Sequence, residues 1–155
     1  MPLVSRRPTL PDVLILAGAG AYLGLALAEG WFRIPAATRL GLEIPEVRFD
    51  GWAAPATRVA AVGAAAAVAW VALRLLRGRP ASGGPDAFLA GVGLILTGLA
   101  VVLPPPTAGG RPSPGPVLAA GMISALTWTV GGFLRWRQGD PQRRTSRHPS
   151  GFGHP

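Results

Sequence analysis

The chain has 155 residues, of which 15 are arginine, none is lysine and seven are acidic, so its formal net charge is +8. The absence of cysteine excludes disulfides, thiolate catalysis and thiolate-bound metals. The arginines gather at the ends of apolar runs and leave no soluble basic face, so we do not expect nucleic-acid binding. The use of arginine without lysine is typical of a GC-rich genome. The alternative explanation is that the arginines recognise phosphate or lipid head groups through paired hydrogen bonds.

Four apolar stretches divide the chain, at residues 13–32, 59–76, 87–103 and 117–134. Each is long enough to cross a hydrocarbon layer of about 30 Å at about 1.5 Å per residue. We therefore expect an all-α fold: a polytopic membrane protein with a four-transmembrane-helix bundle over residues 1–137. The basic, Pro/Gly-rich residues 138–155 should form a disordered cytoplasmic tail.

Local signals mark the helix ends. Thr9 with Asp12 three residues later is a capping-box pattern, and Pro11 suits a first helical turn. Proline and arginine then end the first, second and third spans, at Pro35, at residues 74–80 and at residues 104–106 respectively. The fourth span begins near Pro116 and ends at residues 135–137. Residues 81–86 should form a short turn between the second and third spans.

Residues 33–57 form the longest segment between spans and the main outer surface of the expected bundle. Hydrophobic residues alternate with polar or small ones through Leu42 and Ile44, and again through Val47 and Phe49, with Pro45 interrupting. This alternation predicts either a short extended segment on the membrane surface or a small hairpin.

The arginines are divided unequally between the two sides of a four-span chain. One side has ten: Arg6, Arg7, Arg74, Arg77, Arg79, Arg135, Arg137, Arg143, Arg144 and Arg147. The other has five: Arg33, Arg39, Arg48, Arg58 and Arg111. The positive-inside rule then predicts a multi-pass protein of the bacterial cytoplasmic (inner) membrane with both termini in the cytoplasm. Trp31 and Trp52 would mark the outer interface, and Trp70 and Trp136 the inner one.

The first span has a second interpretation. A basic start, an apolar core and the sequence Ala26-Leu-Ala28 resemble a signal-peptidase site, and cleavage after Ala28 would leave three spans. Asp12 at the head of the core and the continuation of the apolar run to Phe32 favour the uncleaved span.

Glu29 is the acidic residue that the sequence places closest to the interior of a span. Arg33 follows four residues later, and Arg58 begins the second helix at the same side. We expect an interfacial ion pair among Glu29, Arg33 and Arg58, because a carboxylate preceding an arginine by one helical turn pairs well. The alternative is a proton or cation site, since acidic residues within membranes are often functional.

Small residues line two predicted helix faces, which we expect to pack against another helix or a partner. The set is Ala17, Gly20, Gly24 and Ala28 in the first span and Ala120, Ser124, Thr127 and Gly131 in the fourth. A quinone or lipid pocket beside Trp128 is the alternative for the fourth span. We expect lipid head-group contacts from Arg135, Arg137, Arg143, Arg144 and Arg147.

The architecture of the chain resembles that of uncharacterised four-helix membrane proteins of high-GC, actinobacteria-like genomes. The features that carry the resemblance are a basic start with Pro11-Asp12, Trp31 at the end of the first span, Gly51-Trp52 before the second, and four short spans. The resemblance covers roughly residues 6–137 and implies no activity. No catalytic, metal or cofactor site is expected, because no histidine lies in a span and the spans lack paired chemical groups.

The sequence thus predicts a small non-catalytic membrane protein, an accessory or scaffold subunit of a larger complex of membrane-protein subunits. The alternative is an oligomeric pore-former or small transporter, including a holin-like role, built from homo-oligomers through the same small-residue faces. A lipid-modifying enzyme is disfavoured because Glu29 has no partner base.

Overall fold

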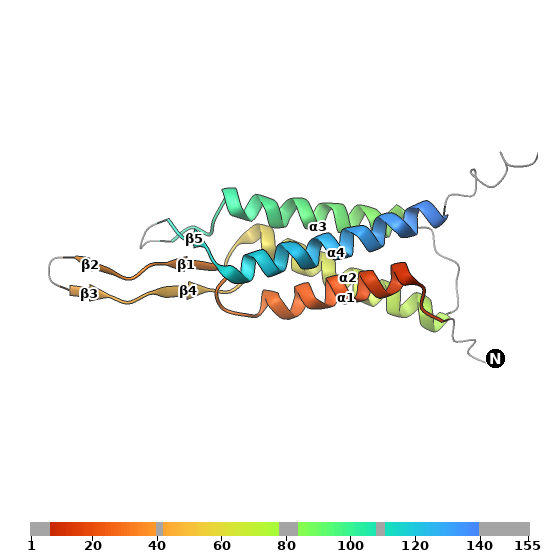
Figure 1. The fold of residues 1–155 in the computed structure, drawn as a ribbon, viewed down its shortest axis with the longest axis horizontal. Coiled ribbons are helices and arrows are strands. Elements are labelled where there is room, and N and C mark those ends of the chain that lie inside the picture. The colour runs from red at the N-terminus through yellow and green to blue at the C-terminus, as the bar shows by residue number, and fades with distance from the viewer. Residues whose placement is uncertain (1–6, 40–41, 78–83, 108–110, 140–155) are drawn as a thin grey trace, which may run out of the picture.

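A computed structural model describes residues 7–39, 42–77, 84–107 and 111–139. Four helices run side by side along the long axis of the molecule (Figure 1). They are α1 (Leu10–Ala26), α2 (Pro55–Arg77), α3 (Gly84–Val102) and α4 (Pro116–Gly139). Five short strands are also present, so the helical bundle was predicted correctly but the all-α description was not exact.

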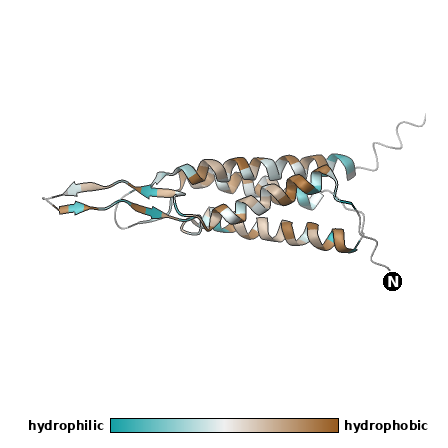
Figure 2. Cartoon of the chain, turned by 60° about the horizontal axis from the view of Figure 1, so that its bottom comes forward, coloured by the Kyte–Doolittle hydropathy of each residue, from teal (hydrophilic) through white to brown (hydrophobic). Residues whose placement is uncertain are grey.

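Three of these helices, α2, α3 and α4, are long and apolar enough to cross a membrane, whereas α1 is apolar but has 17 residues. Large hydrophobic side chains such as Val62, Phe88, Ile95 and Ile123 are exposed on the helix surfaces. Figure 2 shows this apolar character along the helices, with hydrophilic residues at their ends and in the strands. The bundle therefore has the surface of a membrane protein, since a water-soluble bundle would place such side chains inside.

Helix α1 ends six residues before the predicted end of the first span. After Ala26 the chain turns through Gly30, whose φ of 101° suits glycine. The Gly51 amide donates to the Ala26 carbonyl oxygen, and the Gly30 and Trp31 amides both donate to the Phe49 carbonyl oxygen. Trp31 and Phe32 are fully buried by this turn. Burial of these two rings at the end of the bundle explains why the helix does not continue to Phe32.

Residues 32–39 and 42–49 form the two arms of a long hairpin that continues the bundle axis beyond the helix ends (Figure 1). Near the bundle, β1 (Phe32–Ile34) pairs antiparallel with β4 (Val47–Phe49), and farther out β2 (Ala37–Arg39) pairs with β3 (Leu42–Ile44). Strand β5 (Ser113–Pro114) lies on the other side of β1. The predicted hairpin is confirmed; the alternative of a segment lying flat on the membrane surface does not fit the axial direction.

Glycines in α1, α3 and α4 allow two tryptophans to fill the core. A Cβ at Gly93 would lie 2.5 Å from the nearest atom of the Trp128 ring, and one at Gly121 would overlap the Trp31 ring. At Gly18 a Cβ would lie 2.8 Å from the Ser124 carbonyl oxygen, which shows how closely α1 approaches α4. Such close approach is typical of helix packing in membranes.

Candidate functional site

A buried cluster of four charged residues joins all four helices at the end of the bundle that lies away from the hairpin. Asp12 comes from α1, Arg74 from α2, Asp86 from α3 and Arg135 from α4. Arg74 donates through Nη1 to Asp86 Oδ2 at 2.8 Å and through Nη2 to Asp12 Oδ1 at 2.5 Å. Arg135 Nη2 donates to the same Asp12 oxygen. We call these residues the four-charge cluster.

The four-charge cluster is almost completely removed from solvent. The exposed fraction of the side chain is 7% for Arg74, 2% for Asp12, 0% for Asp86 and 12% for Arg135. Two carboxylates and two guanidinium groups have charges that sum to zero. This balance matters because an unpaired charge at this depth would cost several kcal/mol.

Asp12 is the hub of the four-charge cluster. Its second oxygen, Oδ2, accepts hydrogen bonds from the Thr9 amide at 2.9 Å and the Thr9 hydroxyl at 2.7 Å. The predicted capping box at the start of α1 is thereby confirmed. Arg135 Nη1 also donates to Thr9 Oγ1, at 3.1 Å. One carboxylate therefore caps its own helix and links it to α2 and α4.

The position of each charge also matches the dipole of its helix. Asp12 and Asp86 lie in the first turns of α1 and α3, where partial positive charge gathers. Arg74 lies in the last turn of α2, and Arg135 lies near the end of α4, where the partial charge is negative. Consecutive helices alternate in direction, so all four of these helix ends meet at one end of the bundle.

The chemistry of the four-charge cluster suits the fastening of helices. Every charged group in it has an oppositely charged partner, and the pairs connect α1 to α2, α2 to α3, and α1 to α4. Asp86 Oδ1 and Arg74 Nε are buried without a hydrogen-bond partner among the described residues. No group of three or more His, Cys, Asp or Glu side chains that could hold a metal ion occurs within the described ranges.

The predicted ion pair of Glu29, Arg33 and Arg58 is not formed in this structure. Glu29 is exposed in the turn after α1 and has no ion pair within the described part of the chain. Arg58 donates through Nε and Nη2 to the Trp52 carbonyl oxygen, at 3.1 and 2.8 Å. Arg33 lies on β1. The early end of α1 removes the helical turn on which the expected Glu29–Arg33 spacing depended.

The predicted face of α4 lies mostly inside the bundle. Ser124 and Gly131 are buried, whereas Ala120 and Thr127 are half-buried. A Cβ at Gly131 would lie 2.8 Å from the Ile15 amide of α1. This part of the predicted face therefore packs internally against α1.

The predicted face of α1 points the other way. Ala17, Gly20 and Gly24 are exposed and Ala28 is half-buried. A Cβ at Gly20 or Gly24 would meet nothing within 4 Å. Helix α1 instead packs through Ile15, Gly18 and Tyr22. The small residues of the predicted face are thus open to the surroundings of the bundle.

The interior of the bundle is filled by aromatic side chains. Trp128 is fully buried, and Gly93 leaves room for its ring. Tyr22 shares a hydrogen bond of 2.9 Å with Thr97, whose hydroxyl also donates to the Gly93 carbonyl. Trp31, expected at the outer interface, is instead a core residue that donates to the Leu25 carbonyl.

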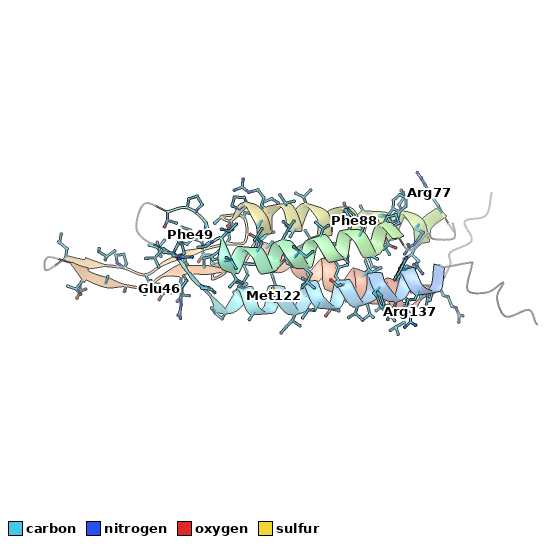
Figure 3. The ribbon with its side chains drawn as sticks, turned by 90° about the horizontal axis from the view of Figure 1, so that it is seen from above. Glu46, Phe49, Arg77, Phe88, Met122 and Arg137 are labelled. Carbon is cyan, nitrogen blue, oxygen red and sulfur yellow. The ribbon has the colours of Figure 1, made fainter. Side chains whose placement is uncertain are left out.

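Two of the arginines expected to contact lipid head groups lie in the described part of the chain, and their surroundings differ. Arg135 belongs to the four-charge cluster, because Asp12 of α1 lies within reach and offers a carboxylate. Arg137 is exposed, with its guanidinium carbon 5.9 Å from the centre of the Phe133 ring. Figure 3 shows Arg137 and Arg77 at the end opposite Glu46 and Phe49. Arg143, Arg144 and Arg147 fall outside the described residues.

The hairpin presents the second notable surface. Leu42, Ile44 and Val47 are exposed, to 72%, 41% and 41%. An open hollow of about 400 Å³ lies where the two pairs of strands meet, lined by Ala36, Ala37, Thr38, Glu43, Ile44 and Pro45. Strands β3 and β4 each form the outer edge of their sheet, so the edge over residues 42–49 is unpaired within the described structure.

No protein-family model matches this chain, and neither a curated protein nor a solved structure matches it. The geometry itself therefore defines the class: a helical bundle with three helices able to span a membrane, fastened by charges at one end and bearing a β-hairpin at the other.

Proposed function

We propose that this chain is a non-catalytic accessory or scaffold subunit of a membrane complex in the bacterial inner membrane, and that its hairpin binds the partner subunit. The observation that carries the proposal is the open-edged hairpin that extends beyond the helix ends and exposes Leu42, Ile44 and Val47 (Figure 1). Both termini would lie in the cytoplasm, so the hairpin would lie on the outer side.

A hairpin of two strands is at best marginally stable by itself in water. Beyond Ile34 and Val47 only β2 and β3 pair with each other, and Leu42 and Ile44 are left exposed. An exposed edge of this kind can pair with an extended segment of another protein, which supplies main-chain hydrogen bonds and covers apolar side chains. A partner subunit would therefore complete what the bundle leaves uncovered.

The bundle supports the role of an anchor. Its interior is filled by Trp31, Trp128 and Tyr22, all fully buried. The four-charge cluster fixes the helix ends relative to one another at the far side. A rigid, filled bundle that holds a projecting hairpin is better suited to positioning another protein than to moving a solute along its own axis.

The test is a shortened hairpin. Residues 35–46 are replaced by Asn-Gly, which joins Ile34 to Val47, a pair of residues already opposite each other in the ladder. The tagged full chain and the variant are purified from native membranes in mild detergent and compared by mass spectrometry. We expect a stoichiometric partner with the full chain, and its loss from a variant whose helical content is unchanged. Purification of the full chain without a partner contradicts the proposal.

A second candidate, an oligomeric pore-former, is favoured by one observation. Gly20 and Gly24 lie on an exposed face of α1 with no atom near their missing Cβ positions. Copies of the chain could approach closely there, as small residues allow in membranes. Expression should then depolarise cells, and Gly24→Leu should abolish the depolarisation. A homo-oligomer without other subunits would favour this candidate over the scaffold.

A further inference from the structure

Two arginines face each other across the strands at the base of the hairpin. Arg33 of β1 and Arg48 of β4 are direct partners in the antiparallel ladder, and both side chains are exposed. Directly opposed residues point to the same face of a sheet, with Cβ atoms about 5 Å apart. Like charges in this position destabilise the pairing, so a neighbouring anion would be stabilising.

The hairpin itself provides a negative charge for only one of these two arginines. Glu46 Oε1 accepts a hydrogen bond from Arg48 Nε at 2.9 Å, on the exposed surface. Arg33 has no ion pair with an acidic side chain among the residues that the structure describes. Glu46 thus offsets the charge of Arg48 alone, and the row of Arg33, Arg48 and Glu46 keeps a net positive charge.

This row of residues lies close to the helix ends. Ser113 of β5 is the partner of Arg33 on the other side of β1, and it precedes Pro116, the first residue of α4, by three positions. Three residues of extended chain span about 10 Å. The polar layer on each side of a bilayer is about 5–8 Å thick. The arginine pair therefore lies near the outer boundary of the head-group layer if the bundle spans the membrane.

The two faces of the sheet at this level differ in character. Phe32 pairs with Phe49 and is fully buried, so the phenylalanine face is turned toward the bundle core. Arg33 and Arg48, one position along each strand, belong to the opposite face. Exposed Leu27 and Leu103 follow the ends of α1 and α3 at the same end of the bundle. Cationic and apolar side chains are thus both exposed at this end of the bundle, and an amphipathic ligand has both a charged and an apolar part.

We propose that Arg33 and Arg48 bind the phosphate of an anionic phospholipid head group in the outer leaflet. Guanidinium groups match phosphate oxygens with paired hydrogen bonds and keep their charge at any physiological pH. A lipid is favoured over an acidic protein because the pair lies near the head-group layer, with exposed leucines at the same end of the bundle. The inference depends on insertion of the bundle into the membrane and is independent of the partner proposed for the hairpin.

The experiment measures binding of short-chain phosphatidylglycerol and short-chain phosphatidylcholine to the full chain in a non-ionic detergent. The variant is Arg33→Gln/Arg48→Gln. The matched control is Arg77→Gln/Arg137→Gln, which removes two exposed arginines from the other end of the bundle (Figure 3). Circular dichroism verifies that each protein keeps its helices.

We expect the full chain to prefer phosphatidylglycerol, and the Arg33/Arg48 variant to lose about 25-fold in affinity for it, about fivefold per arginine. The control variant should lose less than threefold. An equal loss in both variants overturns the proposal, because net charge alone would then explain binding. Equally tight binding of inorganic phosphate also overturns the proposal, in favour of a site for a free anion. Tighter binding of a polyglutamate peptide overturns it in favour of an acidic protein partner.

Discussion

Arg74 holds Asp86 of α3 at 2.8 Å through one guanidinium nitrogen while it holds Asp12 of α1 through another. This single side chain joins three helices, and Arg135 adds the fourth through Asp12. In a bundle whose outer surface is apolar, burial of apolar side chains between helices is a weak guide to their arrangement, because lipid is equally apolar. Directional charge pairs at the helix ends supply the specificity instead.

Arg74→Gln should be strongly destabilising. It leaves Asp86 without its charged partner and removes one of the two arginines from Asp12. We expect a loss of about 3–5 kcal/mol in the free energy of unfolding, measured by denaturation in mixed micelles. Arg77→Gln, an exposed arginine on the same helix, should cost less than about 0.5 kcal/mol. Similar values for the two variants would contradict a structural role for the cluster.

The two acidic residues of the four-charge cluster should differ in importance. Asp12→Asn affects both arginines and the cap of α1, whereas Asp86→Asn leaves Arg74 paired with Asp12. We expect losses of about 3–5 kcal/mol for Asp12→Asn and about 1–3 kcal/mol for Asp86→Asn. The same unfolding assay provides the ranking, and the reverse order would show that Asp12 is not the hub.

Gly18→Ala and Gly20→Ala should have opposite effects, although the residues are two positions apart. A Cβ at Gly18 would lie 2.8 Å from the Ser124 carbonyl oxygen, so α1 and α4 must separate, at a cost of about 1–3 kcal/mol. At Gly20 the Cβ is unobstructed, and the higher helix propensity of alanine should stabilise by up to about 1 kcal/mol. Equal unfolding free energies for the two variants would argue against this packing of α1 on α4.

The Tyr22–Thr97 hydrogen bond should contribute modestly. In a double-mutant cycle of Tyr22→Phe and Thr97→Val, we expect a coupling energy of about 0.6 kcal/mol and at most about 2 kcal/mol. Thr97→Val also removes the bond to the Gly93 carbonyl, and the cycle subtracts that effect. A coupling energy of zero would mean that the two hydroxyl groups do not interact.

The orientation can be tested with single cysteines, because the chain has none of its own. Leu42→Cys on the hairpin should react with a membrane-impermeant maleimide in intact spheroplasts. Arg77→Cys, exposed at the other end, should react only after permeabilisation. The reverse pattern would place the termini outside and contradict the positive-inside assignment.

Much of the fold follows from local sequence. Continuous apolar runs placed the helices, the Thr9–Asp12 pair marked the start of α1, and the alternation around Leu42 and Val47 indicated a hairpin. The sequence also carries a signal for the four-charge cluster. Asp12 and Asp86 begin the odd-numbered helices, Arg74 and Arg135 lie near the ends of the even-numbered ones, and alternating helix directions bring these ends together.

The sequence by itself determined where this protein has helices, because apolar length, capping residues and prolines act within a few residues of the chain. Only the tertiary structure decided which charges meet, which face of α1 packs, and that Trp31 lies in the core rather than at an interface. Those outcomes depend on groups brought together from distant parts of the chain. Arg135, expected to contact lipid, binds Asp12 because folding places a buried carboxylate within its reach.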